Sequence, residues 1–320
     1  MDLSSATGQK SEPINEPINE PINEPINEPI TPINRPVDLN PRKVALGDRL
    51  FHDPQLSHNN ELSCASCHDR NLGGADGRPR SVGFEGGLVS FNAPTVWNSS
   101  LNFRQFWDGR AATLEAQIDG PILEPREMNS NWSEIIAKLS RDRSYVQSFR
   151  GLYPKGIEPE AIRDAIATYE RALVTPNARF DQYLRGNASA LTPKEKEGYR
   201  LFTDYGCVAC HQGVNIGGNL FQRLGIMEDF FLERGAVESA DLGRMNISGR
   251  VRDRYVFKVP SLRNVALTAP YLHDGSINTL EETIDIMARY QLGREIPPDE
   301  VALIVEFLQT LTGEMPAAAQ

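Results

Sequence analysis

The chain contains the pentapeptide Cys64-Ala65-Ser66-Cys67-His68, and the same pattern returns as Cys207-Val208-Ala209-Cys210-His211. A Cys-x-x-Cys-His pattern is typical of covalent c-type haem attachment. The two thiols reach the two vinyl groups of one porphyrin, and the adjacent histidine turns its imidazole onto the iron. The chain has four cysteines, and these two motifs contain all of them. The sequence therefore predicts two covalently bound haem c groups, with His68 and His211 as iron ligands.

Two Cys-x-x-Cys pairs can also build a four-thiolate zinc site or serve as redox dithiols. The pairs of a zinc site usually lie within a few tens of residues of each other, whereas these two pairs lie far apart. Both pairs also carry a directly following histidine, which a redox dithiol does not use. Haem is therefore the favoured interpretation.

The size and charge of the chain narrow its class. Its 320 residues suffice for about two domains, which agrees with one haem motif in each half. A net charge of −10 disfavours binding to nucleic acid. No apolar run approaches the ~20 residues of a membrane-spanning helix. Because c-type haem is attached on the oxidising, extracytoplasmic side, we expect a periplasmic protein, although residues 1–5 begin no apolar signal segment.

The N-terminal stretch repeats one tetrapeptide, from Glu12-Pro13-Ile14-Asn15 to Glu28-Pro29-Ile30-Thr31. Proline at every fourth residue is incompatible with a helix and with pairing in a sheet. We therefore interpret residues 1–36 as an extended, disordered, low-complexity arm. Such an arm is either an inert spacer, which we favour, or a docking or tethering segment.

Helical patterns flank both haem motifs. Asn40-Pro41 is an N-cap followed by proline at the first helical position. Thr192-Pro193 with Glu195 begins a second helix in the same way, and that helix ends near Phe202. Further helical periodicity covers residues 162–173 and 298–312, and Gly313 follows as a stop signal.

Each half of the chain thus reads as helix, haem motif, long loops and helix, with no strand of convincing length. A haem is a large apolar disc that fills the centre of a small domain, so short helices and loops suffice around it. We predict an all-α fold of two cytochrome c-type domains, residues 37–175 and residues 176–320, each around one covalently bound haem. Residues 175–190 are expected to form a connector.

Several further blocks of the chain resemble the bacterial di-haem cytochrome c peroxidases. Their superfamily also includes the di-haem enzyme that matures tryptophan tryptophylquinone. In chain order the blocks read Leu50-Phe51-His52-Asp53-Pro54, Asn92-Ala93-Pro94-Thr95, Phe106-Trp107-Asp108-Gly109-Arg110, Gly120-Pro121-Ile122-Leu123, Lys258-Val259-Pro260-Ser261-Leu262-Arg263-Asn264 and Thr268-Ala269-Pro270-Tyr271-Leu272-His273-Asp274-Gly275. The resemblance covers nearly everything from about residue 40 to 313, and it implies a peroxidatic first haem and an electron-transfer second haem of higher potential.

The resemblance also implies how each iron is ligated. The second iron takes the thioether of Met287 as its sixth ligand, which raises its potential. The quinone-maturing enzymes carry tyrosine at this place, so Met287 favours a peroxidase fed by a small electron donor. At the first iron many family members have a distal histidine, and here Phe84 stands at the matching position. Phenylalanine cannot ligate iron, and no other histidine lies between His68 and His211. We therefore expect an open first iron that needs no reductive activation.

Three further residues match family positions with a role in catalysis. Glu127 matches the distal-pocket glutamate that shuttles the peroxide proton, and burial beside a haem would raise its pKa. Gln117 matches the amide that holds peroxide or water in place. Without the resemblance, both residues read as ordinary polar groups on helix surfaces. Trp107 matches the tryptophan that bridges electron transfer between the two haems.

The resemblance further implies a calcium ion between the domains. Asn92 matches its side-chain ligand, and the backbone carbonyls of Thr268 and Pro270 are expected to bind it as well. Water would complete the shell of this hard cation.

Taken together, the resemblance implies reduction of hydrogen peroxide to water with electrons from a small cytochrome c or cupredoxin, in a family whose members are often homodimers. Two alternatives stay open. One is peroxide-driven oxidative modification of a protein partner, and the other is a plain di-haem electron carrier. Gln117 and Glu127 argue against the carrier, since a carrier needs no distal acid–base pair.

Overall fold

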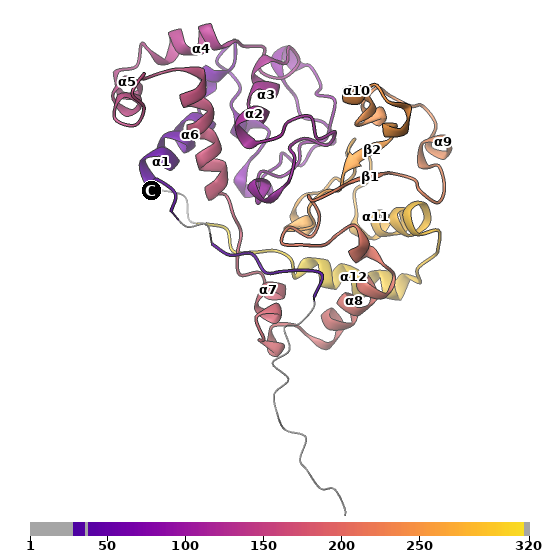
Figure 1. Ribbon diagram of the computed structural model, residues 1–320. Coiled ribbons are helices and arrows are strands. Elements are labelled where there is room, and N and C mark those ends of the chain that lie inside the picture. The colour runs from indigo at the N-terminus through magenta and orange to yellow at the C-terminus, as the bar shows by residue number, and fades with distance from the viewer. Residues whose placement is uncertain (1–27, 36–37, 317–320) are drawn as a thin grey trace, which may run out of the picture.

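The computed structural model describes residues 28–35 and 38–316, and Figure 1 shows them as two lobes of short helices and long loops. Within the described residues the strands are β1 (Phe221–Arg223) and β2 (Val256–Lys258), which pair antiparallel with Phe221 opposite Lys258. The predicted helical class is therefore confirmed, since the remaining regular structure consists of helical turns.

The first lobe contains the helices α1 (Pro41–Phe51), α2 (Leu114–Gln117), α3 (Asp119–Leu123), α4 (Trp132–Leu139), α5 (Arg143–Arg150) and α6 (Pro159–Ala172). The predicted start of α1 is confirmed, because the Asn40 side chain accepts hydrogen bonds from the N–H groups of Arg42 and Lys43. The long loop between α1 and α2 carries the first haem motif, whose residues Cys64–Ser66 form a 3-10 turn.

The second lobe contains α7 (Arg179–Leu184), α8 (Pro193–Asp204), α9 (Phe230–Arg234), α10 (Met245–Ser248), α11 (Leu280–Ile286) and α12 (Pro298–Gln309). The capping box of α8 is confirmed, because Thr192 and Glu195 each bond to the other's backbone N–H.

The predicted end of α8 near Phe202 is confirmed, because the helix ends at Asp204. Two other local predictions about this lobe need correction. The predicted connector contains the helix α7. The helix α12 ends at Gln309, and Gly313 is not its stop, because the N–H of Gly313 donates to Asn264 Oδ1 at 3.1 Å. A tertiary contact therefore outweighs the stop signal of that glycine.

The two lobes share one packing arrangement. In each, the helix before the haem motif packs along the last helix, α1 on α6 and α8 on α12. A glycine lies at both contacts. A Cβ atom at Gly47 would lie 2.0 Å from the Ala165 carbonyl oxygen, and one at Gly198 would lie 2.0 Å from the Leu303 carbonyl oxygen. Each helix pair is therefore as close as its backbones allow.

Residues 28–35 do not form a detached arm. Ile30 and Ile33 are each only 1% exposed, and Ile30 packs into the core of the second lobe. The expectation of disorder is therefore wrong for this part of the repeat, because its isoleucines are apolar enough to fill a core. Residues 1–27 lie outside the described residues.

Backbone contacts hold the same segment in place. The Pro29 carbonyl accepts from the N–H of Gly213 at 2.8 Å, just after the second haem motif. The Thr31 carbonyl accepts from Arg263 Nη2 at 3.0 Å. Proline does not prevent this arrangement, because the segment is held mainly through its carbonyls, and the N–H of Ile33, a residue other than proline, donates to Asp181 Oδ1 at 3.4 Å.

The described segments around Arg35 and Glu314 meet between the lobes. Figure 1 shows the indigo N-terminal stretch running from the second lobe to α1, and the yellow C-terminal stretch leaving α12 toward α1. Arg35 Nη2 pairs with Glu314 Oε2 at 3.2 Å. At the predicted boundary, Thr175 Oγ1 accepts from the side-chain amides of Asn98 at 2.8 Å and Asn264 at 2.9 Å. These residues join the lobes at a buried polar junction.

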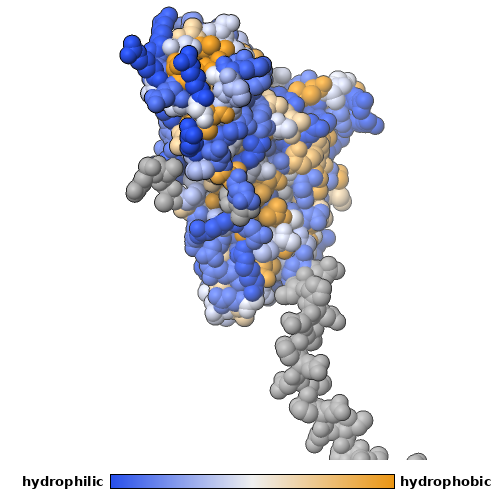
Figure 2. Space-filling model, turned by 60° about the vertical axis from the view of Figure 1, so that its left-hand side comes forward, coloured by the Kyte–Doolittle hydropathy of each residue, from blue (hydrophilic) through white to orange (hydrophobic). Residues whose placement is uncertain are grey.

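The face of the molecule in Figure 2 is mostly hydrophilic, with hydrophobic side chains exposed in limited areas. None of the helices in the described residues has the length and apolar character that crossing a membrane requires.

Candidate active site

A cavity of about 170 Å³ lies beside the first haem motif. Cys64, Cys67 and His68 contribute to its wall. Apolar side chains form much of the remainder, among them Phe51, Leu114, Ile122 and Ile166. This largely apolar lining suits a flat, mostly apolar cofactor such as a haem.

In both motifs the histidine ring uses Nδ1 for a hydrogen bond to a backbone carbonyl. His68 Nδ1 donates to the Gly74 carbonyl at 3.2 Å, and His211 Nδ1 donates to the Ile216 carbonyl at 3.4 Å. Burial lowers the pKa of His68, and lowers the pKa of His211 to about 4, so both rings are neutral. A neutral ring whose Nδ1 carries the proton has Nε2 free to bind a metal.

The protein surroundings favour the protonated thiol at Cys64, Cys67 and Cys207. Burial raises the pKa of Cys64 to about 12 and that of Cys207 to about 11. No disulfide joins the four cysteines, all of which lie in the described part of the chain. A raised pKa disfavours the thiolate form, so these cysteines are poorly suited to act as free nucleophiles.

The wall of the first cavity also contains buried polar groups that have no hydrogen-bond or ion-pair partner among the described residues. Lys258 is only 7% exposed, and burial alone lowers its pKa to about 8, since no described residue pairs with its ammonium group. The hydroxyls of Ser81 and Ser99, which also line the cavity, are buried without a hydrogen-bond partner among the described residues. A haem fits this site, because one of its propionates would pair with the buried ammonium group of Lys258.

The predicted distal residues line this same cavity. Gln117 ends α2, and Glu127 lies in the turn after α3. Burial raises the pKa of Glu127, with a further contribution from Glu124, while Arg110 opposes the shift. No described residue hydrogen-bonds to the Glu127 carboxylate. The carboxylate of Glu127 therefore takes up a proton more readily than that of an exposed glutamate.

Phe84 does not line the cavity. Its ring packs against His58, with the ring centroids 5.8 Å apart. Its N–H donates to the Glu127 carbonyl at 2.8 Å, so this loop lies against the turn that carries Glu127. The adjacent Gly83 makes the close approach possible, because a Cβ there would lie 1.9 Å from the Arg126 carbonyl oxygen. No side chain with a metal ligand stands at this position.

Trp107 lies where the two lobes meet. It lines the first cavity and packs against an apolar cluster of the second lobe that also contacts Met287. Its indole N–H donates to the Asn92 carbonyl at 3.0 Å, and its own carbonyl accepts from the N–H of Lys258 at 2.7 Å. Met287 itself is half-buried at the start of the π-helical turn Met287–Gln291.

The expected calcium ligands lie near this junction. The N–H of Asn92 donates to the His273 carbonyl at 2.8 Å, and its Nδ2 donates to the Arg78 carbonyl at 2.8 Å. The amide oxygen of Asn92 is thereby left free. Thr268 and Pro270 precede His273 in the same loop, and no described backbone N–H donates to either carbonyl.

One cluster with the composition of a metal site is an ion-pair network instead. Ligand atoms of Asp241, His273 and Asp274 lie within 4.8 Å of one another. However, Arg234 pairs with both carboxylates, and His273 Nε2 bonds to Asp241 Oδ1 at 2.7 Å. His273 is therefore a hydrogen-bonding member of this network.

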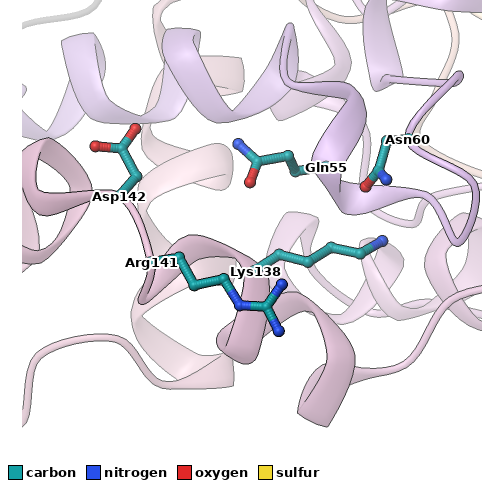
Figure 3. Close-up of a pocket in the computed structure, with 5 residues that line it drawn as sticks. All are labelled: Gln55, Asn60, Lys138, Arg141 and Asp142. Carbon is teal, nitrogen blue, oxygen red and sulfur yellow. The ribbon is translucent and has the colours of Figure 1, made fainter.

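A second hollow, shown in Figure 3, lies away from the motif residues and is lined by Gln55, Asn60, Lys138, Arg141 and Asp142. Lys138 is already engaged there, because its ammonium donates to the carbonyls of Ser57 and His58. We assign this polar surface depression no function.

Comparison with known proteins places this geometry in a family. Residues 41–189 match the family model described as di-haem cytochrome c peroxidase. The chain is 50% identical over 283 residues to the cytochrome c peroxidase Ccp of Escherichia coli (strain K12), covering 88% of this chain and 60% of that protein. It is 44% identical over 287 residues to the cytochrome c551 peroxidase of Nitrosomonas europaea, covering 89% of this chain and 84% of that protein. The chain belongs to the di-haem cytochrome c peroxidase family.

A solved structure supports the family assignment over the whole chain. The crystal structure of a MauG-like protein associated with microbial copper homeostasis matches with a TM-score of 0.78 and 31% sequence identity, covering 95% of this chain and 96% of that one. The family resemblance seen in the sequence is confirmed, and so is the enzyme class, an oxidoreductase of the peroxidase type with haem cofactors.

Two residues of the peroxidase cavity were missed from the sequence. Glu170 breaks the apolar face of α6, where it follows Ile166 by one helical turn, and this buried carboxylate was the available signal. Lys258 belongs to β2 of the second lobe yet lines the cavity of the first. No local sequence pattern indicates that placement.

Proposed function

We propose that this peroxidase reduces hydrogen peroxide to two waters at its first haem, with electrons that enter singly at the second haem. One observation carries the assignment to this site: Gln117, Glu127 and the first haem motif line the same cavity. A pure electron carrier has no use for a proton-active side chain beside its haem. A small cytochrome c or cupredoxin is the proposed donor.

Cys64 and Cys67 would hold the first haem by thioether bonds, and His68 would bind its iron through Nε2. Lys258 would pair with a propionate. The second haem would be held in the same way by its own motif, with Met287 as the sixth ligand of its iron. The haem supplies the metal that binds peroxide and the electrons that cleave it.

The distal side chains would manage the protons of the overall reaction, H2O2 + 2 e− + 2 H+ → 2 H2O. The Glu127 carboxylate takes the proton from one peroxide oxygen and delivers it to the other, which then leaves as water. The amide of Gln117 holds the peroxide in line for this transfer. The apolar wall of the cavity keeps bulk water from competing for the same proton.

Trp107 would carry electrons between the two haems, since its indole lies against both the first cavity and the cluster that contacts Met287. Calcium bound by Asn92, Thr268 and Pro270 would stabilise this junction. Covalent haem attachment supports a periplasmic location.

We further propose that the first iron is open in the resting oxidised enzyme, because Phe84 faces His58 rather than the cavity. The absorption spectrum of the oxidised holoenzyme should then contain a high-spin haem component, and one equivalent of peroxide should change it. A spectrum of low-spin haem alone, unaltered by peroxide, would refute an open peroxidatic site.

Oxidative modification of a protein partner is the second candidate, supported by the similarity to the MauG-like structure. Met287 favours the peroxidase, since a thioether-ligated second haem suits a small electron donor. Rapid oxidation of a reduced cytochrome c by peroxide would support the first function. Peroxide-dependent change in a partner protein, with slow cytochrome oxidation, would support the second.

A further inference from the structure

Glu170 is the cavity residue that the proposed mechanism leaves without a role. It lies on α6, is 4% exposed, and faces Gln117 at the end of α2. Gln117 Nε2 lies 3.0 Å from Oε1 and 3.2 Å from Oε2 of the Glu170 carboxylate. No other described residue hydrogen-bonds to this carboxylate. The partly buried Gln117 and the buried Glu170 therefore form a hydrogen-bonded pair in the wall of the distal cavity.

The surroundings of Glu170 make its charge costly. Burial raises the pKa of Glu170 to about 8, and the hydrogen bond from Gln117 only partly opposes this effect. The positive charge of the neighbouring Arg171 also lowers the pKa of Glu170, whereas the negative charge of Glu115, which binds the Arg171 guanidinium, raises it. Cys64 lies close enough for the negative charge of Glu170 to raise its pKa, and it brings no positive charge. Both protonation states of Glu170 are therefore accessible near neutral pH.

We propose that Glu170 is a positioning residue that decides which end of the Gln117 amide faces the distal cavity, and that the amide turns over when Glu170 changes its protonation state. This inference rests on the proposed role of Gln117 in the peroxidase.

The hydrogen-bonding rules of the two groups produce the switch. An ionised carboxylate only accepts, so it holds the Gln117 NH2 group and leaves the amide oxygen facing the cavity. A protonated carboxyl group donates its O–H to that amide oxygen, which turns the NH2 group toward the cavity. The cavity thus gains a hydrogen-bond donor below the pKa of Glu170 and an acceptor above it. When Glu170 is protonated, the NH2 group of Gln117 would donate to an unprotonated peroxide oxygen. When Glu170 is ionised, the amide oxygen of Gln117 would accept from a peroxide O–H.

Fluoride tests this orientation, because it binds ferric haem and only accepts hydrogen bonds. We would measure its dissociation constant at the first haem of the oxidised holoenzyme by absorption spectroscopy across pH. The constant should rise about tenfold as the pH passes upward through the pKa of Glu170, since one hydrogen bond to the anion, worth ~1.4 kcal/mol, is lost. Infrared spectroscopy should show the C=O band of a protonated carboxyl group that disappears over the same pH range.

Two variants separate Glu170 from other titrating groups, including Glu127. Glu170→Gln should remove both the fluoride step and the infrared band, since an amide does not titrate there. Glu115→Gln is the matched control. It should keep the step and move it to lower pH, because the negative charge that raises the pKa of Glu170 is removed.

Each outcome of the fluoride titration supports or contradicts the proposed amide switch. Fluoride binding without the step in the wild-type protein, or with the same step in Glu170→Gln, would overturn the switch and leave the peroxidase proposal intact. Absence of fluoride binding at every pH would overturn the open first iron and the switch together. If Glu170→Gln does not fold, fluoride binding by the wild-type protein and by Glu115→Gln still tests the proposal. A wild-type dissociation constant that does not rise with pH, or a rise at the same pH in Glu115→Gln, would contradict it.

Discussion

Burial drives the ionisable side chains around the first cavity toward their neutral forms. It raises the pKa of Glu127 and raises that of Glu170 to about 8. It lowers the pKa of His68 and lowers that of Lys258 to about 8. Removing water penalises whichever form is charged, so acids and bases shift in opposite directions. The same apolar wall therefore prepares a neutral imidazole for iron and a carboxyl group able to exchange protons.

Glu127→Gln should lower the turnover of peroxide about 10²- to 10⁴-fold, because an amide cannot take up the peroxide proton. The haem absorption spectrum should stay largely unchanged. Wild-type activity should fall as the pH drops below the raised pKa of Glu127, where the carboxylate becomes protonated, and this acid limb should vanish in the variant. Steady-state kinetics with reduced cytochrome c across pH would measure both effects.

Glu124→Gln serves as the control for that substitution, since Glu124 is an exposed neighbour whose charge raises the pKa of Glu127. It should keep the activity and shift the acid limb to lower pH. Full activity in Glu127→Gln would remove Glu127 from the mechanism.

At the scale of elements, both domains depend on a close helix pair. α1 lies against α6 at Gly47, and α8 lies against α12 at Gly198. In each pair the first helix leads directly to a haem motif, so its position determines where the motif cysteines and histidine lie. Any side chain at these glycines would push the motif away from the helix that closes the domain.

Gly47→Ala and Gly198→Ala should each destabilise the holoenzyme by about 1–3 kcal/mol, although alanine normally favours a helix over glycine. The reason is steric, since a Cβ at either position would lie 2.0 Å from a carbonyl oxygen of the partner helix. Chemical denaturation followed by circular dichroism would measure the loss. Lys194→Ala, at an exposed position of α8, should change the stability little. A neutral or stabilising Gly198→Ala would contradict the close packing.

At the scale of the whole molecule, segments from both ends of the described chain connect the two lobes. Residues 28–35 pack on the second lobe before the chain enters the first, and Glu314 returns to pair with Arg35. The ion pair is exposed and contributes little by itself. The burial of Ile30 and Ile33 is the stronger tie, because each side chain is nearly fully removed from water.

Ile30→Ala should therefore lower the free energy of unfolding by about 2–5 kcal/mol, as expected for a buried isoleucine that leaves a cavity. Differential scanning calorimetry of the holoenzyme would detect the loss as a lower melting temperature. Leu232→Ala is the comparison, since Leu232 lies in the same lobe and is 82% exposed. A melting temperature equal to that of the wild type would mean that the segment does not contribute to the core.

The sequence by itself determined the haem motifs, the helical class and the helix starts at Asn40 and Thr192. These depend on covalent spacing and on hydrogen bonds within a few residues, so neighbours along the chain suffice to predict them. Recognised blocks along the chain also led to Gln117 and Glu127, which the fold places in one cavity.

Only the tertiary structure decided that Ile30 fills a core, that Gly313 bonds to Asn264, and that Lys258 of one lobe enters the cavity of the other. It also paired Glu170 with Gln117 across two helices. These contacts join residues far apart in the chain, and their energy comes from burial and from the exclusion of water, which no local pattern encodes.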